Sequence, residues 1–182
     1  MTATRSIRNI ALCGFMGTGK SSVGRLVAEQ LHFAFLDTDT VIEARAGKSV
    51  AQIFAEQGEA AFRELEQRLV KELEQRDRTV ISTGGGLIVN PENLASLQRH
   101  AYVVCLWASP ETIFSRVKNQ GHRPLLHEPE PLEKICRLLA ERKPFYKQAD
   151  AHLTTELRSP REVAQQVLHQ FRVARVAPVA HS

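Results

Sequence analysis

A glycine-rich segment near the amino terminus carries the residue types that bind phosphate groups. Residues 14–21 read GFMGTGKS and fit the pattern G-x-x-x-x-G-K-[ST]. The glycines let the backbone curl so that its N–H groups face phosphate oxygens, and a helix that begins at the lysine adds partial positive charge. In this pattern Lys20 reaches the β- and γ-phosphates and the Ser21 hydroxyl binds Mg²⁺. The segment therefore predicts a nucleoside triphosphate site formed by Gly14, Gly17, Thr18, Gly19, Lys20, Ser21 and Ser22.

The surroundings of this segment favour a phosphate site over a glycine-rich turn that binds nothing. An apolar run precedes it at residues 10–14, and apolar residues at helical spacing follow it through Leu31. Average residue usage would produce the pattern by chance about once in 100 to 200 chains of this length. The N-K-x-D segment with which GTPases read guanine is absent from the sequence, and the chain is short for a motor or a large ATPase. A small kinase fits best.

Five further motifs follow in order: LDTD at 36–39, FRELE at 62–66, TGGG at 83–86, RPLL at 123–126 and ERKPFY at 141–146. Each alone has an ordinary explanation. Arg63 and Glu66 fit a surface pair on one helix face, and Arg142 fits a solvated cation at a helix end. Asp37 and Asp39 fit a helix cap, and the glycine triplet fits a flexible turn. Behind a phosphate-binding loop, their joint occurrence favours a functional reading.

The set of motifs resembles the shikimate kinase family, from about Ile7 to Val167. The resemblance implies transfer of the γ-phosphate of ATP to the 3-hydroxyl of shikimate with Mg²⁺ present, a step of chorismate and aromatic amino acid biosynthesis. It also implies catalytic roles for Lys20, Asp39 and Arg123. The stretch 127–131 and the residues after Phe171 are not covered by it.

The implied roles suit the chemistry of shikimate, a small ring with one carboxylate and three hydroxyl groups. The planar guanidinium of arginine binds a carboxylate through two hydrogen bonds and keeps its charge. By resemblance, Arg63 and Arg142 hold the carboxylate, and Asp39 bonds the ring hydroxyls. Asp39 either accepts the hydroxyl proton or only orients the hydroxyl. The remaining implied ligands are Glu66, Gly84, Gly85 and Gly86 for the substrate, and Ser21 and Asp37 for Mg²⁺, the latter through water.

An irregular segment at about 116–131 is expected to form a lid over the site, because it contains Gly121 and three prolines. By resemblance, Arg116 lies along the adenine and the phosphates, and Arg123 reaches the phosphate that is transferred. A mobile cation can meet the charge of the transition state when a lid closes. The ordinary alternative is an exposed loop with two arginines.

The elements that must position these residues alternate between strand and helix. Apolar runs predict strands at 10–14, 33–36, 79–83, 102–107 and 151–154; helices are predicted at 20–31, in a short stretch capped by Ser49, at 59–75, from Pro110, at 130–142 and at 160–172. This order predicts a three-layer α/β/α sandwich around a five-stranded parallel sheet, the P-loop kinase type. A single domain at 1–172 and a flexible tail at 173–182 are expected. Phe54, Phe62 and Trp107 are expected in the core.

Composition narrows the partners. The chain has 182 residues and a net charge of +4, and its basic residues are scattered, which disfavours nucleic acid but suits phosphates and carboxylates. The three cysteines, Cys13, Cys105 and Cys136, form no metal-site or disulfide pattern and are expected to be reduced. With no visible signal peptide and no long apolar run, a cytoplasmic monomer without a membrane partner is expected.

Two rival functions remain open. One is a kinase for another small polyol acid, such as gluconate, on the same frame. The other is a regulatory module that responds to nucleotide without catalysis. The intact set of Lys20, Ser21, Asp37 and Arg123 argues against the second.

Overall fold

Five parallel strands form the sheet of this protein, whose computed structural model describes residues 5–118 and 130–176. The strand order is β2-β3-β1-β4-β5, and every neighbouring pair is parallel. The strands are β1 (Asn9–Cys13), β2 (Ala34–Asp37), β3 (Thr79–Ser82), β4 (Ala101–Trp107) and β5 (Ala151–Thr154). The predicted five-stranded parallel sheet is thus confirmed, and no strand end differs from its predicted position by more than one residue.

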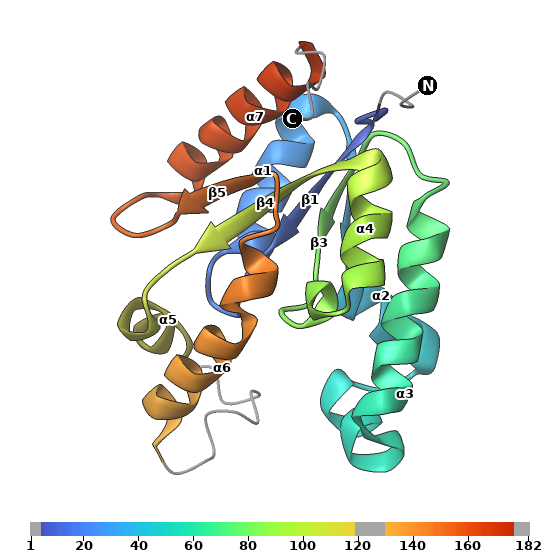
Figure 1. Cartoon of the computed structure of the whole chain (residues 1–182), viewed down its shortest axis with the longest axis vertical. Coiled ribbons are helices and arrows are strands. Elements are labelled where there is room, and N and C mark those ends of the chain that lie inside the picture. The colour runs from blue at the N-terminus through green and yellow to red at the C-terminus, as the bar shows by residue number, and fades with distance from the viewer. Residues whose placement is uncertain (1–4, 119–129, 177–182) are drawn as a thin grey trace.

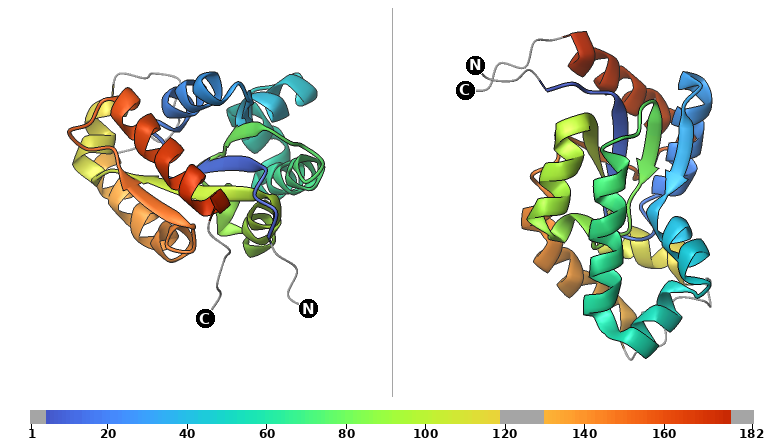
Figure 2. Two further views of the ribbon diagram at one scale, coloured as in Figure 1. Left: turned by 90° about the horizontal axis from the view of Figure 1, so that it is seen from above. Right: turned by 90° about the vertical axis from the view of Figure 1, so that its right-hand side faces the viewer.

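Helices cover both faces of the sheet (Figures 1 and 2). They are α1 (Lys20–Leu31), α2 (Thr38–Ala46), α3 (Val50–Leu73), α4 (Pro91–His100), α5 (Pro110–Val117), α6 (Pro131–Tyr146) and α7 (Pro160–Val176), with a 3₁₀ turn η1 (Leu87–Val89). Alternate residues of β1 enter two separate cores, as the two-residue period of a strand requires. Ile10 and Leu12 pack with α1 and α7, whereas Ala11 and Cys13 pack with α3, α4 and α6. This confirms the predicted three layers.

Several helix starts carry the signals that the sequence showed. Ser49 forms a capping box with Gln52 at the start of α3, and the Ser109 side chain caps α5. Gly58 has φ 82° and ψ 171°, which breaks α3 into the expected short and long helices. Helix α4 was not predicted from the sequence, although Asn90 caps it and Pro91 occupies its first turn.

The last two helices run further than predicted. α6 continues through Pro144 to Tyr146, and α7 ends at Val176. The extension of α6 matters for the site, because it places Arg142 and Tyr146 one turn apart on one rigid element.

Two expectations fall partly or wholly outside the described residues. Residues 119–129 of the expected lid, including Arg123, lie outside the described ranges. Residues 177–182 of the expected tail also lie outside them. Within the described ranges, no helix is both long and apolar enough to span a membrane. Of the three cysteines, none forms a disulfide; Cys13 and Cys105 are buried and Cys136 is exposed.

All five strands are parallel, so the loops after their carboxyl ends gather at one edge of the sheet. The phosphate-binding segment follows β1, the LDTD motif spans the end of β2, and the glycine triplet follows β3. The fold therefore brings together three motifs that are far apart in the sequence.

Candidate active site

The loop between β1 and α1 has the backbone that a phosphate site needs. Gly14, Gly17 and Gly19 have φ angles of 130°, 76° and 90°, a region that disfavours residues with a side chain. A Cβ atom at Gly14 would lie 2.2 Å from the carbonyl oxygen of Leu106, so the site also excludes a side chain sterically. Gly19 directly precedes α1, and the loop therefore opens onto the amino terminus of a 12-residue helix.

Lys20 lies along this loop. Its Nζ atom donates a hydrogen bond to the carbonyl oxygen of Phe15 at 2.9 Å, and the buried Thr18 hydroxyl donates to the same oxygen at 2.8 Å. Two side chains of the loop region therefore hold the carbonyl group of Phe15 in place. Ser22 follows on α1 and is exposed.

Ser21 and Asp37 form a group of hard oxygen atoms beside the loop. The Ser21 hydroxyl donates to Oδ2 of Asp37 at 2.8 Å and lies 3.3 Å from the hydroxyl oxygen of Ser82. The other oxygen of Asp37 accepts bonds from the backbone N–H groups of Asp39 and Thr40 at 3.2 and 3.4 Å, which caps α2. Hydroxyl and carboxylate oxygens are the ligands that Mg²⁺ takes from proteins, so these residues fit the ion.

The carboxyl groups of Glu66, which is buried, and Asp39, which is partly buried, meet beside the glycine triplet. Burial, and next the charge of Asp37, raises the pKa of Asp39 to about 6, against the opposing effect of Lys20. Burial also raises the pKa of Glu66, although Arg63 opposes this. Among the described residues, Oδ1 of Asp39 and Oε1 of Glu66 are buried without a hydrogen-bond partner. A Cβ at Gly84 would lie 2.5 Å and 3.1 Å from these two atoms.

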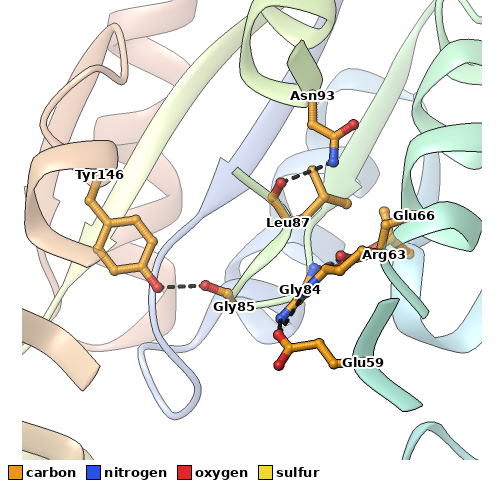
Figure 3. Close-up of polar contacts among 9 residues, drawn as sticks. Glu59, Arg63, Glu66, Gly84, Gly85, Leu87, Asn93 and Tyr146 are labelled. Atoms are coloured by element: carbon orange, nitrogen blue, oxygen red, sulfur yellow. Dashed lines mark hydrogen bonds and ion pairs between the residues drawn. The ribbon is translucent and has the colours of Figure 1, made fainter. Parts of the chain in front are cut away.

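Arg63 on α3 faces the same loop (Figure 3). It donates to Glu66 at 2.7 Å and to Glu59 at 2.8 and 3.1 Å, so three hydrogen bonds hold its guanidinium. A Cβ at Gly86 would lie 2.7 Å from Nη2 of Arg63, which explains why this position has no side chain. In this pair Glu66 is buried and Arg63 is half-buried and held in one orientation, so it differs from an ordinary surface pair.

Arg142 approaches the loop from the other side. Its guanidinium carbon lies 5.4 Å from the centre of the Phe15 ring, and its Nη1 would be 3.5 Å from a Cβ at Gly85. The triplet thus lies between an arginine on α3 and an arginine on α6, which agrees with the arrangement of these helices in Figure 1.

Two residues that the sequence analysis did not assign bind the backbone of the triplet. The Thr38 hydroxyl accepts a hydrogen bond from the N–H of Gly84 at 2.9 Å. The Tyr146 hydroxyl donates to the carbonyl oxygen of Gly85 at 2.6 Å (Figure 3). Thr38 stands between the two predicted aspartates and Tyr146 one turn after Arg142, so their positions in the motifs were the available signal.

The expectation that Phe54 belongs to the core is wrong. Its side chain is 36% exposed, whereas Phe62 is buried and Trp107 is partly buried against the core. The Phe54 ring lies 4.9 Å from the Phe62 ring, and the guanidinium of Arg63 lies 6.0 and 5.6 Å from the two ring centres. Because Phe54 lies in the first turns of α3, next to Arg63, it gives this side of the site an apolar surface.

Arg116 joins the phosphate-binding loop to the segment after β5. It donates to the carbonyl oxygen of Gly17 at 3.2 Å, and to the hydroxyl and carbonyl oxygens of Thr155 at 2.9 and 2.8 Å. Arg116 therefore lies beside the phosphate-binding loop, on the side away from Arg63.

A parallel sheet, a phosphate-binding loop that opens onto a helix, and two arginines beside a glycine triplet at the same sheet edge together define a P-loop kinase for small molecules. The family model of shikimate kinase matches residues 16–172. The chain belongs to the shikimate kinase family.

Individual proteins agree with this assignment. The shikimate kinase of Thermodesulfovibrio yellowstonii is 43% identical over 165 residues, which is 91% of this chain and 95% of that protein. A solved structure of shikimate kinase from Acinetobacter baumannii in complex with shikimate is 35% identical and superposes with a TM-score of 0.89, covering 96% of this chain and 98% of that one. A gluconokinase from Sinorhizobium meliloti, 16% identical with a TM-score of 0.61 over 94% of this chain and 95% of that one, shares the fold alone.

Proposed function

We propose that this protein transfers the γ-phosphate of ATP to the 3-hydroxyl of shikimate, giving ADP and shikimate 3-phosphate. The observation that carries the proposal is the placement of Arg63 and Arg142 on opposite sides of the glycine triplet. Two fixed guanidinium groups suit a carboxylate on a small ring. Asp39, beside the same triplet and close enough for Lys20 to affect its pKa, suits a ring hydroxyl near the phosphates.

Each residue of the pocket then has a definite task. Lys20 neutralises charge on the β- and γ-phosphates, and the backbone N–H groups of residues 14–19 bind the phosphate oxygens. Arg63, oriented by Glu66 and Glu59, binds the substrate carboxylate together with Arg142. Gly84, Gly85 and Gly86 let the backbone approach the ring closely.

Asp39 receives or orients the proton of the hydroxyl that attacks. With a pKa of about 6, its carboxylate is ionised at neutral pH and is more basic than an ordinary aspartate. The hydroxyl oxygen forms a bond to phosphorus while the bond from phosphorus to the β–γ bridging oxygen breaks. Because the transition state of phosphoryl transfer is loose, positioning and charge neutralisation contribute more than base strength.

Ser21 and Asp37 would hold Mg²⁺, the serine directly and the aspartate through water. When bound, the ion neutralises charge on the β- and γ-phosphate oxygens. The fit rests on the oxygen atoms that these residues already bring together.

The end of α5 and the expected lid each supply one further cation in this proposal. Arg116, fixed against Gly17 and Thr155, lies along the nucleotide, and Arg123 acts on the transferring phosphate after closure. An interaction made mainly in the transition state lowers the barrier without tightening substrate binding. We expect Arg123→Ala to lower kcat and kcat/KM by similar factors and to leave the Kd for shikimate nearly unchanged. A raised KM with an intact kcat would show that Arg123 only binds the ground state.

A panel of acceptors tests the proposed function. Purified protein with ATP and Mg²⁺ should release ADP rapidly with shikimate, and slowly with gluconate or with no acceptor. Faster release with gluconate would favour the other polyol acid kinase, and no release with any acceptor would favour a regulatory module. We also propose that the enzyme is a cytoplasmic monomer, and size-exclusion chromatography with light scattering tests the oligomeric part.

A further inference from the structure

The glycine triplet needs external support, because glycine restricts the backbone less than any other residue. Hydrogen bonds to the backbone supply that support from several directions. Leu87 and Val89 in η1 donate to the carbonyl oxygens of Gly84 and Gly86, and Thr38 accepts from the N–H of Gly84. The carbonyl of Gly85 is bound by a different layer of the molecule, through the Tyr146 hydroxyl on α6.

We propose that Tyr146 is a positioning residue for the acceptor substrate. Its hydrogen bond holds the Gly85 peptide against α6, the helix that also carries Arg142. The inference rests on the proposed function, since it assigns a role within the shikimate pocket. Tyr146 touches the loop backbone rather than the reacting atoms.

The peptide geometry explains how one hydrogen bond orients the loop. The described chain contains no cis peptide bond, so the C=O of Gly85 and the N–H of Gly86 point in opposite directions. With the carbonyl directed at Tyr146, the N–H of Gly86 points away from α6. Figure 3 shows Tyr146 on one side of the loop and Arg63 on the other, so the bond sets which face of this peptide meets the pocket.

The spacing on α6 couples this peptide to the predicted carboxylate ligand. Arg142 and Tyr146 are four residues apart on a helix, so their side chains lie on the same face. Arg142 lies beside Gly85, and Tyr146 binds the carbonyl of that same residue. A shift of the loop relative to α6 would therefore change the distance between the triplet and one of the two guanidinium groups.

Tyr146 keeps the proton that it donates to Gly85. Its side chain is buried in the core layer of α3, α4 and α6, and burial raises the pKa of the phenol above its ordinary value, against the opposing effect of Arg142. The hydroxyl thus stays protonated across the physiological range, and its 2.6 Å bond to Gly85 is independent of pH there. The ring itself packs in the core, so a phenylalanine can replace the ring but not the hydrogen bond.

Tyr146→Phe tests the proposal, with Tyr102→Phe as the matched control. Tyr102 is the other tyrosine of the chain and is also buried, but it pairs with Ile10 towards the amino-terminal edge of the sheet, away from the triplet. Loss of a neutral hydrogen bond that leaves its acceptor without a partner should raise the KM for shikimate in Tyr146→Phe by roughly 3- to 30-fold. The KM for ATP should change less than twofold, and Tyr102→Phe should match wild type in both constants.

Three results decide the matter. An unchanged KM for shikimate in Tyr146→Phe would overturn the proposal. An equal rise in both KM values, together with a lowered Tm, would overturn it too, because it indicates a general structural role. In an Arg142→Ala background the effect of Tyr146→Phe should shrink, since the two residues act on one ligand; multiplicative effects would contradict the coupling. If wild type itself fails to release ADP with shikimate, the proposed function fails rather than this inference.

Discussion

The ionised carboxylate of Asp39 lies in a partly buried environment that favours the neutral form. Its pKa of about 6 in the folded protein lies above the ordinary 3.8, so the folded state holds this proton more tightly than the unfolded state. The stability that the neutral carboxyl provides is complete below the unfolded pKa and is lost as the pH rises through about 6. The ionised, active form is therefore the less stable form.

This conflict predicts that Asp39→Asn is more stable than wild type at high pH. A shift of about two pKa units corresponds to roughly 2 to 3 kcal/mol, so the variant should gain up to that amount at pH 8 and little at pH 4. Turnover should fall strongly. Urea unfolding at both pH values, with ADP release at pH 8, measures the two effects. A stability difference that does not depend on pH would contradict the assigned cause.

Replacing Arg63 or Arg142 with alanine should weaken substrate binding to a similar extent, but the two substitutions should affect stability differently. Loss of either charge-assisted contact should weaken shikimate binding by roughly 2 to 5 kcal/mol, and ATP binding much less, which calorimetry can measure. Arg63→Ala should also destabilise the fold, because Glu66 is 1% exposed and loses its partner. Arg142 has no such buried carboxylate of its own in the described ion pairs.

A matched double variant checks the origin of that destabilisation. Glu66→Gln in the Arg63→Ala background removes the uncompensated charge and should restore part of the lost stability without restoring shikimate affinity. Equal melting temperatures for Arg63→Ala and Arg142→Ala would instead show that the Arg63–Glu66 pair contributes little to the fold.

At the start of α2, Asp37 fits both explanations of the LDTD motif, a helix cap and a metal-binding role. Asp37 caps this helix through Oδ1 and binds Ser21 through Oδ2, so the cap and the proposed metal role are both compatible with the structure. Asparagine caps helices about as well as aspartate but lacks the negative charge. The two roles can therefore be separated by substitution.

Asp37→Asn should keep the thermal stability of wild type and need more Mg²⁺ for half-maximal rate. Asp37→Ala should lose about 1 kcal/mol of stability in addition, because the cap is removed. Thermal unfolding and Mg²⁺ titration of ADP release measure the two effects. A Mg²⁺ requirement for Asp37→Asn equal to that of wild type would assign Asp37 to the cap alone.

The elements that the sequence predicted are those with strong local signals. β1 and α1 flank a glycine loop, and the Ser49 and Ser109 side chains cap helices. The strands are more apolar than the segments on either side of them. α4 was missed because its apolar residues are few and its buried face includes Asn93 and Ser96. The end of α6 was misplaced because Pro144, which normally ends a helix, lies inside its last turn here.

At the scale of the molecule, the location of the site follows from topology, but its internal contacts do not. A parallel sheet with a phosphate-binding loop after β1 requires the loops after β2 and β3 to lie at the same edge, and the sequence motifs stand in those loops. Which side chain meets which backbone group depends on tertiary packing between α3, α6 and the triplet. The roles of Thr38 and Tyr146, and the exposure of Phe54, therefore became visible only in the structure.

The most direct test of the central claim is phosphate transfer itself. Wild-type protein and Lys20→Ala are incubated with shikimate, Mg²⁺ and ATP labelled in the γ-phosphate, and the products are separated and identified. The account predicts that wild type moves the label to the 3-hydroxyl of shikimate in equal amount to the ADP formed, and that folded Lys20→Ala moves almost none. Label released only as inorganic phosphate, or transfer by Lys20→Ala at the wild-type rate, would contradict it.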